Sequence, residues 1–465
     1  MIFRKQIKAI LFLAFIVYVS VAAIKKNLSG GEQPVYVAPS EQRSGNAQKG
    51  YDYLINGDYI KSGIGYEYYL LLNGKYKNNF LQRNGKAANI RYDFNLIKTE
   101  KNVSIVVPNC LQCHAQIFDN KLIVGLGNSM MDFSNMQTLS DAKSLAARRL
   151  MQKISPRQYE AALPLMRTFD EVYPFLQTEV QGVNAADRLA SVLSAHRDPA
   201  TLEWHDEPLL NVPDEVIPTD VPAWWLLKKK NAMFYNGFGR GDFATFLMLS
   251  NLLTVKDTIE AKETSLHAGD MLAYINSIEP PKYPYPVNTE LAAKGKEIFT
   301  VTCSKCHGSY GDEEKYPNLL IPETIIGTDS MLYKSNYQNP QFIEWFNKSW
   351  YAQGEHSAKL SPFSGYIAPP LDGVWITAPY LHNGSVPTLE ALLNSKKRPQ
   401  YWKRNFKNPQ YDYENVGWKY EEVNKSSDKK TYNTNLAGYR NTGHNFGDAL
   451  TEGSRKALIE YLKTL

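Results

Sequence analysis

The sequence lacks any concentration of charge of one sign. Its 52 basic and 47 acidic side chains leave a net charge of only +5 across 465 residues. Proteins that bind nucleic acid usually carry a basic stripe that contacts phosphates, and this sequence shows none. The charge pattern therefore argues against nucleic acid as a partner.

The sequence also lacks the composition that is typical of a disordered chain. The hydrophobic content of 43% and the charged content of 21% are those of an ordinary folded protein. At 465 residues the chain is too long for one common core, so we expect two domains of roughly 200 residues each. Domains of this size have room for large cofactors.

The first thirty residues differ from the rest of the chain. Basic side chains precede an apolar run at 9–24, and two lysines close it. The run exceeds a usual signal-peptide core but falls short of the roughly 20 residues that span a bilayer comfortably. We therefore predict that residues 1–30 are a signal peptide or an N-terminal membrane anchor. The body of the protein is then expected in the periplasm, free or anchored to the inner membrane.

Cysteine is scarce, and all four cysteines fall in two copies of one pattern. The copies are Cys110-Leu111-Gln112-Cys113-His114 and Cys303-Ser304-Lys305-Cys306-His307. Two thiols three positions apart can add to the two vinyl groups of a haem, and the following histidine then ligates the iron. The sequence therefore predicts two covalently bound haem c groups, with iron at His114 and His307.

Three other interpretations of these cysteines remain open. They are a pair of disulfides, a thioredoxin-like redox site, and a four-cysteine zinc site. None of them requires the histidine that follows both pairs. The export segment also favours haem, because c-type haem is generally attached on the outer side of the bacterial membrane.

A proline-dense stretch separates the two motifs. Residues 279–286 cannot continue a helix and predict a stiff, extended linker. We place an N-terminal haem domain at 44–278 and a C-terminal cytochrome c domain at 287–465. The predicted fold class is mainly α, with two cytochrome c-like haem domains, long loops and minor β-hairpins.

Local patterns predict elements around both motifs. Thr289 should cap a helix that leads to the second motif, and Thr451 should cap a final helix that packs on it. In the first half, β-branched runs at 103–107 and 121–124 predict a short hairpin around Cys110. Helical patterns there fall at 140–152 and 184–196.

The sixth ligand of each iron separates an electron carrier from a catalyst. His444 has the best context, because the glycines in 441–447 let the backbone approach a flat ligand. We predict His444 as the distal ligand of the second haem. His382, in the proline-bounded loop 378–389, is predicted as a ligand or as a pocket residue. The histidines with weaker context are His196, His205, His267 and His356.

No sixth ligand of the first haem can be named from the sequence. Methionine is the other usual ligand, although most methionines fill cores. The candidates are Met130, Met131, Met136, Met233 and Met331. Trp224, Trp225 and Trp375 are expected either to pack in the core or to line the haems and the path between them. Asp372 alone does not define a calcium site.

The second half resembles a known family in three segments. They are Pro369-Pro370-Leu371-Asp372-Gly373-Val374-Trp375, Ala378-Pro379-Tyr380-Leu381-His382-Asn383-Gly384-Ser385 and Gly443-His444-Asn445-Phe446-Gly447. They resemble dihaem cytochromes of the rubber-oxygenase-like group, within the bacterial cytochrome c peroxidase and methylamine-utilisation superfamily. The resemblance covers most of residues 290–465. In the first half it rests on residues 125–128 and the Pro-Ala-Trp-Trp segment at 222–225. Rubber oxygenases are considerably longer than this chain.

The resemblance implies roles for the two haems. It implies that His307 and His444 are the axial pair of the second haem, and that the first haem, held by His114, meets an oxidant. The expected function is an exported dihaem cytochrome with electron transfer and peroxidase- or oxygenase-like activity. Its partners would be a redox protein, such as another cytochrome or a small electron carrier, and O2 or peroxide. The alternative is a non-catalytic, membrane-tethered electron carrier with two six-coordinate haems.

Overall fold

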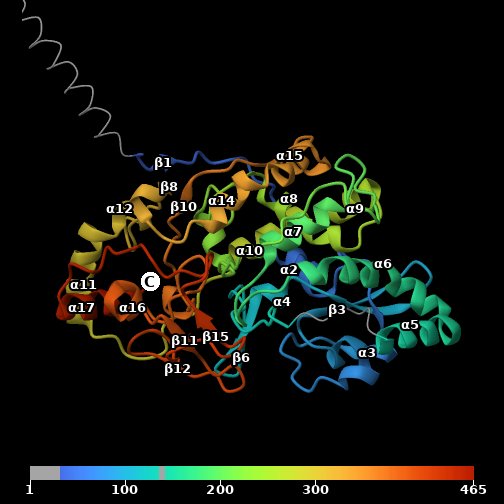
Figure 1. Ribbon diagram of the computed structural model, residues 1–465, viewed down its shortest axis with the longest axis horizontal. Helices are drawn as coiled ribbons and strands as arrows, with labels where there is room; N and C mark the ends of the chain where they lie inside the picture. The colour runs from blue at the N-terminus through green and yellow to red at the C-terminus, as the bar shows by residue number, and fades with distance from the viewer. Residues whose placement is uncertain (1–31, 136–141) are drawn as a thin grey trace, which may run out of the picture.

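The computed structural model describes residues 32–135 and 142–465 and shows a fold of mixed class (Figure 1). Among these residues 39% are helical and 13% lie in strands, which form several small sheets. The prediction of a mainly α fold with minor hairpins is therefore wrong. All of the described strands have two to five residues, too few to show the two-residue periodicity that reveals a strand in a sequence.

Helices in the first half surround the first motif. The α-helices are α2 (Ala47–Asn56), α3 (Tyr66–Asn73), α4 (Leu111–His114), α5 (Ala142–Ile154), α6 (Pro156–Val172), α7 (Ala186–Ala195), α8 (Phe243–Leu247), α9 (Thr258–Ser265) and α10 (Ala268–Ser277). The 3-10 helices are η1 (Gly85–Asn89), η2 (Tyr173–Phe175), η3 (Trp224–Lys229) and η4 (Met248–Leu253). The helix predicted at 184–196 corresponds to α7, and the one predicted at 140–152 to α5, although residues 140 and 141 lie outside the described residues.

Helices in the second half surround the second motif. The α-helices are α11 (Thr289–Thr302), α12 (Ser304–His307), α13 (Glu323–Ile326), α14 (Met331–Gln338), α15 (Pro340–Lys348), α16 (Leu389–Leu393) and α17 (Glu452–Leu462). The 3-10 helices are η5 (Trp350–Ala352), η6 (Val374–Ile376) and η7 (Ser395–Lys397). In Figure 1, α11, α12, α16 and α17 lie at one end of the molecule.

Strands connect segments that are far apart in the sequence. They are β1 (Val35–Tyr36), β2 (Ile64–Gly65), β3 (Phe94–Lys98), β4 (Ser104–Pro108), β5 (Ala115–Phe118), β6 (Lys121–Val124), β7 (Gly239–Gly241), β8 (Leu319–Pro322), β9 (Ala358–Leu360), β10 (Gly365–Ile367), β11 (Tyr401–Lys403), β12 (Tyr411–Asp412), β13 (Gly417–Trp418), β14 (Glu421–Glu422) and β15 (Thr431–Asn433). The sheet orders are β1-β8-β10, β14-β11-β15, β12-β13, β2-β4-β3, β5-β6 and β7-β9. All of these pairs are antiparallel.

The strands beside the first motif pair differently from the prediction. β4 lies between β2 and β3, and β6 pairs with β5, which directly follows His114. The predicted hairpin between 103–107 and 121–124 is therefore wrong, although both segments contain strands. The two-residue turn at Asp119 and Asn120 explains the actual hairpin, because both residues have a positive φ that suits a tight turn.

The helix that leads to the second motif packs on the final helix, as predicted. Asn288, one residue before the predicted cap Thr289, accepts the capping hydrogen bond of α11 from Leu291 N. Thr451 caps α17 as predicted, through Ser454 N. The two helices meet so closely that a Cβ on Gly295 would lie 2.0 Å from the carbonyl oxygen of Ala457.

Two large apolar cores contain side chains from both sides of 279–286. The core around the first motif includes Phe346 and Tyr351 beside α7, α8 and α10. The core around the second motif includes Phe118 and Trp225 beside α11 and α17. The boundaries at 44–278, 279–286 and 287–465 stay predictions.

The predicted export segment at 1–30 lies outside the described residues. Within the ranges that are described, no helix is long and apolar enough to cross a membrane.

Candidate functional site

The second motif lies at the junction of α11 and α12. Cys303 ends α11, and its backbone N–H donates to the carbonyl of Phe299, so the two cysteines and His307 follow in one tight turn. Gly308 ends α12 with φ +86°, a conformation that favours glycine, and a Cβ there would lie 2.3 Å from the carbonyl of Lys315. The backbone therefore turns sharply directly after His307.

His307 is held in one orientation by a backbone carbonyl. Its Nδ1 lies 2.8 Å from the backbone carbonyl oxygen of Pro369. Because a carbonyl oxygen can only accept a hydrogen bond, Nδ1 carries the proton and donates it. The remaining nitrogen, Nε2, then has a free lone pair. Histidine ligands of metals are generally oriented by such a hydrogen bond from the other ring nitrogen.

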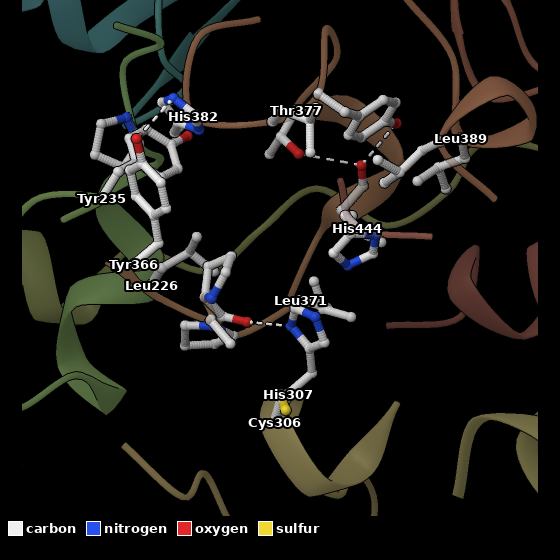
Figure 2. A pocket seen from close by; sticks show the side chains of 18 of the residues that line it. Leu226, Tyr235, Cys306, His307, Tyr366, Leu371, Thr377, His382, Leu389 and His444 are labelled. Carbon is white, nitrogen blue, oxygen red and sulfur yellow. Dashed lines mark hydrogen bonds between the residues drawn. The ribbon is translucent and has the colours of Figure 1, made fainter. Parts of the chain in front are cut away.

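His444 faces His307 across a cavity. The two ring centroids are 6.1 Å apart and the planes are inclined by 64° (Figure 2). The backbone N–H of His444 donates to Ile326 at 2.8 Å. Before it, Gly443 has φ +71°, and a Cβ on it would lie 2.3 Å from the backbone nitrogen of Thr328. The glycine therefore permits the close approach that positions His444.

Arg398 fixes the loop that carries His444. Its Nη1 donates to the carbonyls of Asn441 and Gly443 at 2.6 and 2.7 Å, and its Nη2 donates to His444 at 3.1 Å. Hydrogen bonds from a guanidinium are stronger than those between neutral groups. Arg398 could not be predicted from the sequence, because an arginine that donates to backbone carbonyls leaves no motif.

Both facing histidines are neutral. Burial lowers the pKa of His444 to about 3, with His307 and Arg398 adding repulsion. Burial also lowers the pKa of His307, against the opposing effect of its hydrogen bond to Pro369. Neutral imidazole is the form that ligates metals, so the protonation state of both rings suits a metal between them.

The cavity beside this pair is large and mostly apolar. Its volume is about 210 Å³, and roughly 10–15 Å³ by this measure holds one water molecule. Its wall includes both cysteines of the second motif, both histidines, and side chains from the first half of the chain. The apolar side chains in the wall include Leu126, Leu226, Phe299, Leu371, Leu389 and Leu458.

The residues of this cavity fit a haem. Two imidazole rings that bind one metal ion from opposite sides would have centroids about 6 Å apart, because each metal–nitrogen bond is roughly 2 Å and each centroid lies about 1 Å beyond the nitrogen. The observed separation of 6.1 Å matches this value. Nδ1 of His444 is buried without a hydrogen-bond partner. Among the described residues no three His, Cys, Asp or Glu side chains gather into a metal-ligating cluster. A haem needs only two protein ligands, because its porphyrin supplies four nitrogens.

The first motif is packed against aromatic and polar side chains. His114 ends α4, and its ring stacks on Trp224 with a centroid distance of 4.6 Å and an angle of 18°. Asn184 Nδ2 lies 3.4 Å from Sγ of Cys113. Nδ1 of His114 is buried without a partner, and burial lowers the pKa of this ring to about 3. This donor set also fits the proximal side of a haem.

The thiols do not fit the alternative interpretations. None of the four cysteines forms a disulfide. Cys110 packs at the core of the first motif and Cys303 at that of the second, so the two pairs do not form one zinc site. Burial raises the pKa of Cys110 to about 11 and that of Cys303 to about 12. A redox-active dithiol needs a thiol that is easily deprotonated, and these thiols are the opposite.

His382 lies in the wall of the same cavity but apart from the facing pair (Figure 2). Its Nε2 is 3.1 Å from the hydroxyl of Tyr366, and the two rings stack at 4.2 Å. Its carbonyl accepts from the backbone N–H of Asp220 at 2.7 Å. The structure thus brings His382 to the cavity, and its role as ligand or pocket residue stays a prediction.

The other candidate residues lie in various parts of the fold. His196 contacts the carbonyl of His205, His267 stacks on Tyr53, and His356 is exposed. Met130 packs at the core of the second motif, Met131 and Met233 pack at the core of the first, and Met331 begins α14. Met136 lies outside the described residues. Asp372 pairs with Lys229 at 2.6 Å.

Trp225 and Trp375, the other two tryptophans singled out in the sequence, are buried in the core of the second motif. Trp225 is fully buried and its Nε1 donates to the carbonyl of Asp372 at 2.8 Å. Nε1 of Trp375 donates to the carbonyl of Pro281 at 2.7 Å. Of the three tryptophans singled out in the sequence, Trp224 is the one stacked on a motif histidine.

Comparison with known proteins finds a family match in the second half of the chain. Residues 365–403 match a family described as RoxA-like, cytochrome c-like; the matched segment includes Pro369, His382 and Arg398. The uncharacterized protein y4iM of Sinorhizobium fredii (strain NBRC 101917 / NGR234) is 27% identical, over 54% of this chain and 66% of that protein. The uncharacterized protein y4iJ of the same organism is 26% identical, over 48% of this chain and 46% of that protein. The chain thus matches only part of the length of either relative. Its 365–403 segment is similar to the RoxA-like cytochromes and implies covalently bound haem c and a haem-based cytochrome function.

Proposed function

We propose that this chain is an exported dihaem c-type cytochrome that transfers electrons between its two haems and a redox partner protein. The observation that carries the proposal is the facing pair His307 and His444, across an apolar cavity whose wall also contains Cys303 and Cys306. Attachment points, axial ligands and an apolar pocket are thus assembled at one place. A bound haem supplies a one-electron redox centre there.

The side chains around the second site would bind a haem, fix the loop of His444 and exclude water. With a haem bound, His307 and His444 would be the two side chains that hold its iron, and the hydrogen bond from His307 to the carbonyl of Pro369 would strengthen the donation of electron density by His307. Arg398 holds the loop of His444 in place. The apolar wall excludes water, which tunes the redox potential.

Trp224 supports electron transfer between the two sites. Its ring contacts His114, and its neighbours Val221, Pro222, Ala223 and Leu226 line the cavity of the second motif. One short segment therefore contacts the first motif on one side and the second site on the other.

Haem-based oxidoreductase activity belongs to the first site in this proposal. Two histidines are available to fill the axial positions of the second site, which leaves no position for O2 or peroxide. Among the described residues no second histidine makes a ring contact with His114 as His444 does with His307. The second candidate function is a non-catalytic electron carrier, favoured by the same two facing histidines, with both haems six-coordinate.

Haem stoichiometry and spin state test the proposal. The chain, expressed with haem-maturation factors, should give two haems in a pyridine haemochrome assay. Replacing Cys110 and Cys113 by alanine, or Cys303 and Cys306 by alanine, should each remove one. A content of two haems that neither double variant lowers would contradict the assignment.

Electron paramagnetic resonance then separates the two functions. A high-spin ferric signal that disappears in the Cys110/Cys113 variant, together with CO binding to the reduced protein, supports catalysis at the first site. Low-spin signals from both haems, with no binding of CO or cyanide, support the carrier.

Export and membrane contact are part of the proposal and rest on residues 1–30. Cell fractionation with and without these residues tests them, because loss of the segment should retain the chain in the cytoplasm without attached haem.

A further inference from the structure

The mostly apolar wall of the cavity of the second motif also contains polar side chains. Among them are Asp220, Lys230, Tyr235, Tyr366 and His382. Tyr235, Tyr366 and His382 lie together on one side of the cavity (Figure 2). Most of them bind one another or the backbone. Tyr235 donates to Asp220 at 2.8 Å, and Tyr366 donates to the carbonyl of Asp329 at 2.5 Å.

Lys230 differs from the rest of this group because it has no acidic partner. Only 9% of its surface is exposed, and its Nζ has one long contact of 3.4 Å, to the carbonyl of Phe234. The two lysines before it are both paired. Lys228 binds Glu279, and Lys229 binds Glu314 and Asp372.

A second unpaired cation lies close to Lys230. Arg240 donates to the carbonyls of Gly237 and Gly239, and neither cation takes part in a salt bridge within the described residues. The charge of Arg240 and, above all, burial lower the pKa of Lys230 to about 8. Lys230 is therefore still mostly charged at neutral pH.

A buried cation without a counter-ion is costly. Removing an ammonium group from water costs several kcal/mol unless an anion pairs with it. The described residues provide no such anion at Lys230, so the cavity is suited to an occupant that brings one.

We propose that Lys230 is a carboxylate-binding residue of this cavity and pairs with a carboxylate of the group held by Cys303, Cys306 and His307. The inference rests on the proposed function, because that group would be a haem. A haem is an apolar ring with two carboxylates at one edge, and the cavity has a mostly apolar wall that also contains the unpaired cation Lys230. Asp220 is unsuited to the role, because its carboxyl group is itself acidic and already accepts from Tyr235.

The redox potential of the complete dihaem protein tests this role. Lys230→Met removes a positive charge that stabilises the reduced state, so the midpoint potential of one haem should fall while the other stays unchanged. Lys230→Arg should restore most of the potential. Lys228→Met, a neighbouring lysine paired at the surface with Glu279, is the matched control and should change neither potential.

Haem content, measured on the same samples, distinguishes a failure of the proposed function from a failure of the role of Lys230. Loss of haem at Cys303 and Cys306 in the unmodified chain would refute the proposed function itself. Two haems per chain with unchanged potentials in Lys230→Met and in a second neutral variant, Lys230→Gln, would overturn the role of Lys230 alone.

An added carboxylate distinguishes the source of the anion. If Lys230 pairs with the haem, titration with acetate should leave both potentials of the unmodified protein unchanged. A saturable shift with acetate that disappears in Lys230→Met would mean that the site takes a free anion, and would overturn the pairing.

Discussion

The rings of His114 and Trp224 lie nearly parallel, 4.6 Å apart. This contact joins the first motif to η3, whose preceding residues line the cavity of the second motif. An aromatic side chain that contacts the first motif thus directly follows residues that line the cavity of the second, although the two motifs are 193 residues apart in the sequence (303 − 110).

Replacing Trp224 by leucine should slow electron exchange between the two haems several-fold, because the aromatic contact with His114 is lost. Flash photolysis or pulse radiolysis of the half-reduced protein measures this rate. Trp402→Leu is the control, since Trp402 is equally buried but stacks on Tyr432. Equal rates in the two variants would remove Trp224 from the electron path.

Replacing His444 by alanine should convert one haem from low spin to high spin. The variant loses one of the two facing rings, so the reduced protein should also gain a CO-binding site. Electron paramagnetic resonance and CO difference spectra measure both effects. His356→Ala, at an exposed histidine, should leave both spectra unchanged, and an unaltered spin state in His444→Ala would disprove ligation by this residue.

Arg398→Leu should destabilise the protein by about 3 kcal/mol, because several carbonyls lose a charged donor. It should also broaden the low-spin signal assigned to the His307–His444 pair, since the loop at 441–444 is no longer fixed. Denaturant unfolding and low-temperature spectra check the two effects. A purely structural role would change the stability but leave the low-spin signal sharp.

Acid should weaken the fold through buried histidines such as His382. Burial lowers its pKa from 6.5 to about 3, so below pH 6.5 the unfolded chain binds a proton that the folded chain does not. Stability is therefore complete above pH 6.5 and falls as the pH decreases towards 3, by about 1.4 kcal/mol per pH unit for such a residue. His382→Gln should show a shallower decline between pH 6 and 5 in urea unfolding. An unchanged slope, or the same change in the exposed-site control His205→Gln, would argue against a buried neutral His382.

Gly295→Ala should destabilise the contact between α11 and α17 by about 1–3 kcal/mol, because its Cβ would collide with the carbonyl of Ala457. Thermal unfolding measures the loss. Gly453→Ala, at a position with open space, should be neutral or slightly stabilising. Equal effects of the two substitutions would mean that the helices separate to admit the methyl group.

The sequence predicted the parts of the fold that have strong local signals. The caps and the apolar periodicity of α11 and α17 predict both helices, and the spacing of cysteines and histidines identifies the two motifs. The flanking glycines singled out His444, which the structure brings opposite His307; its role as a haem ligand stays a prediction. Such features act within a few residues, so they are visible without knowledge of the tertiary structure.

Features that depend on distant pairing were missed or misassigned. β1 joins β8 across almost 300 residues of chain, and two-residue strands have no periodicity to recognise. Lys230 looks like one of three solvated lysines, and only its burial distinguishes it from Lys228. Arg398 likewise acts through backbone carbonyls that carry no sequence signal.

The close contact of Gly295 with Ala457 ties the second motif to a segment far along the chain. α11 leads directly into Cys303, and α17, at Glu452–Leu462, packs against α11. A substitution that loosens α17 would therefore also loosen the helix that positions Cys303, Cys306 and His307, without touching any of these three residues.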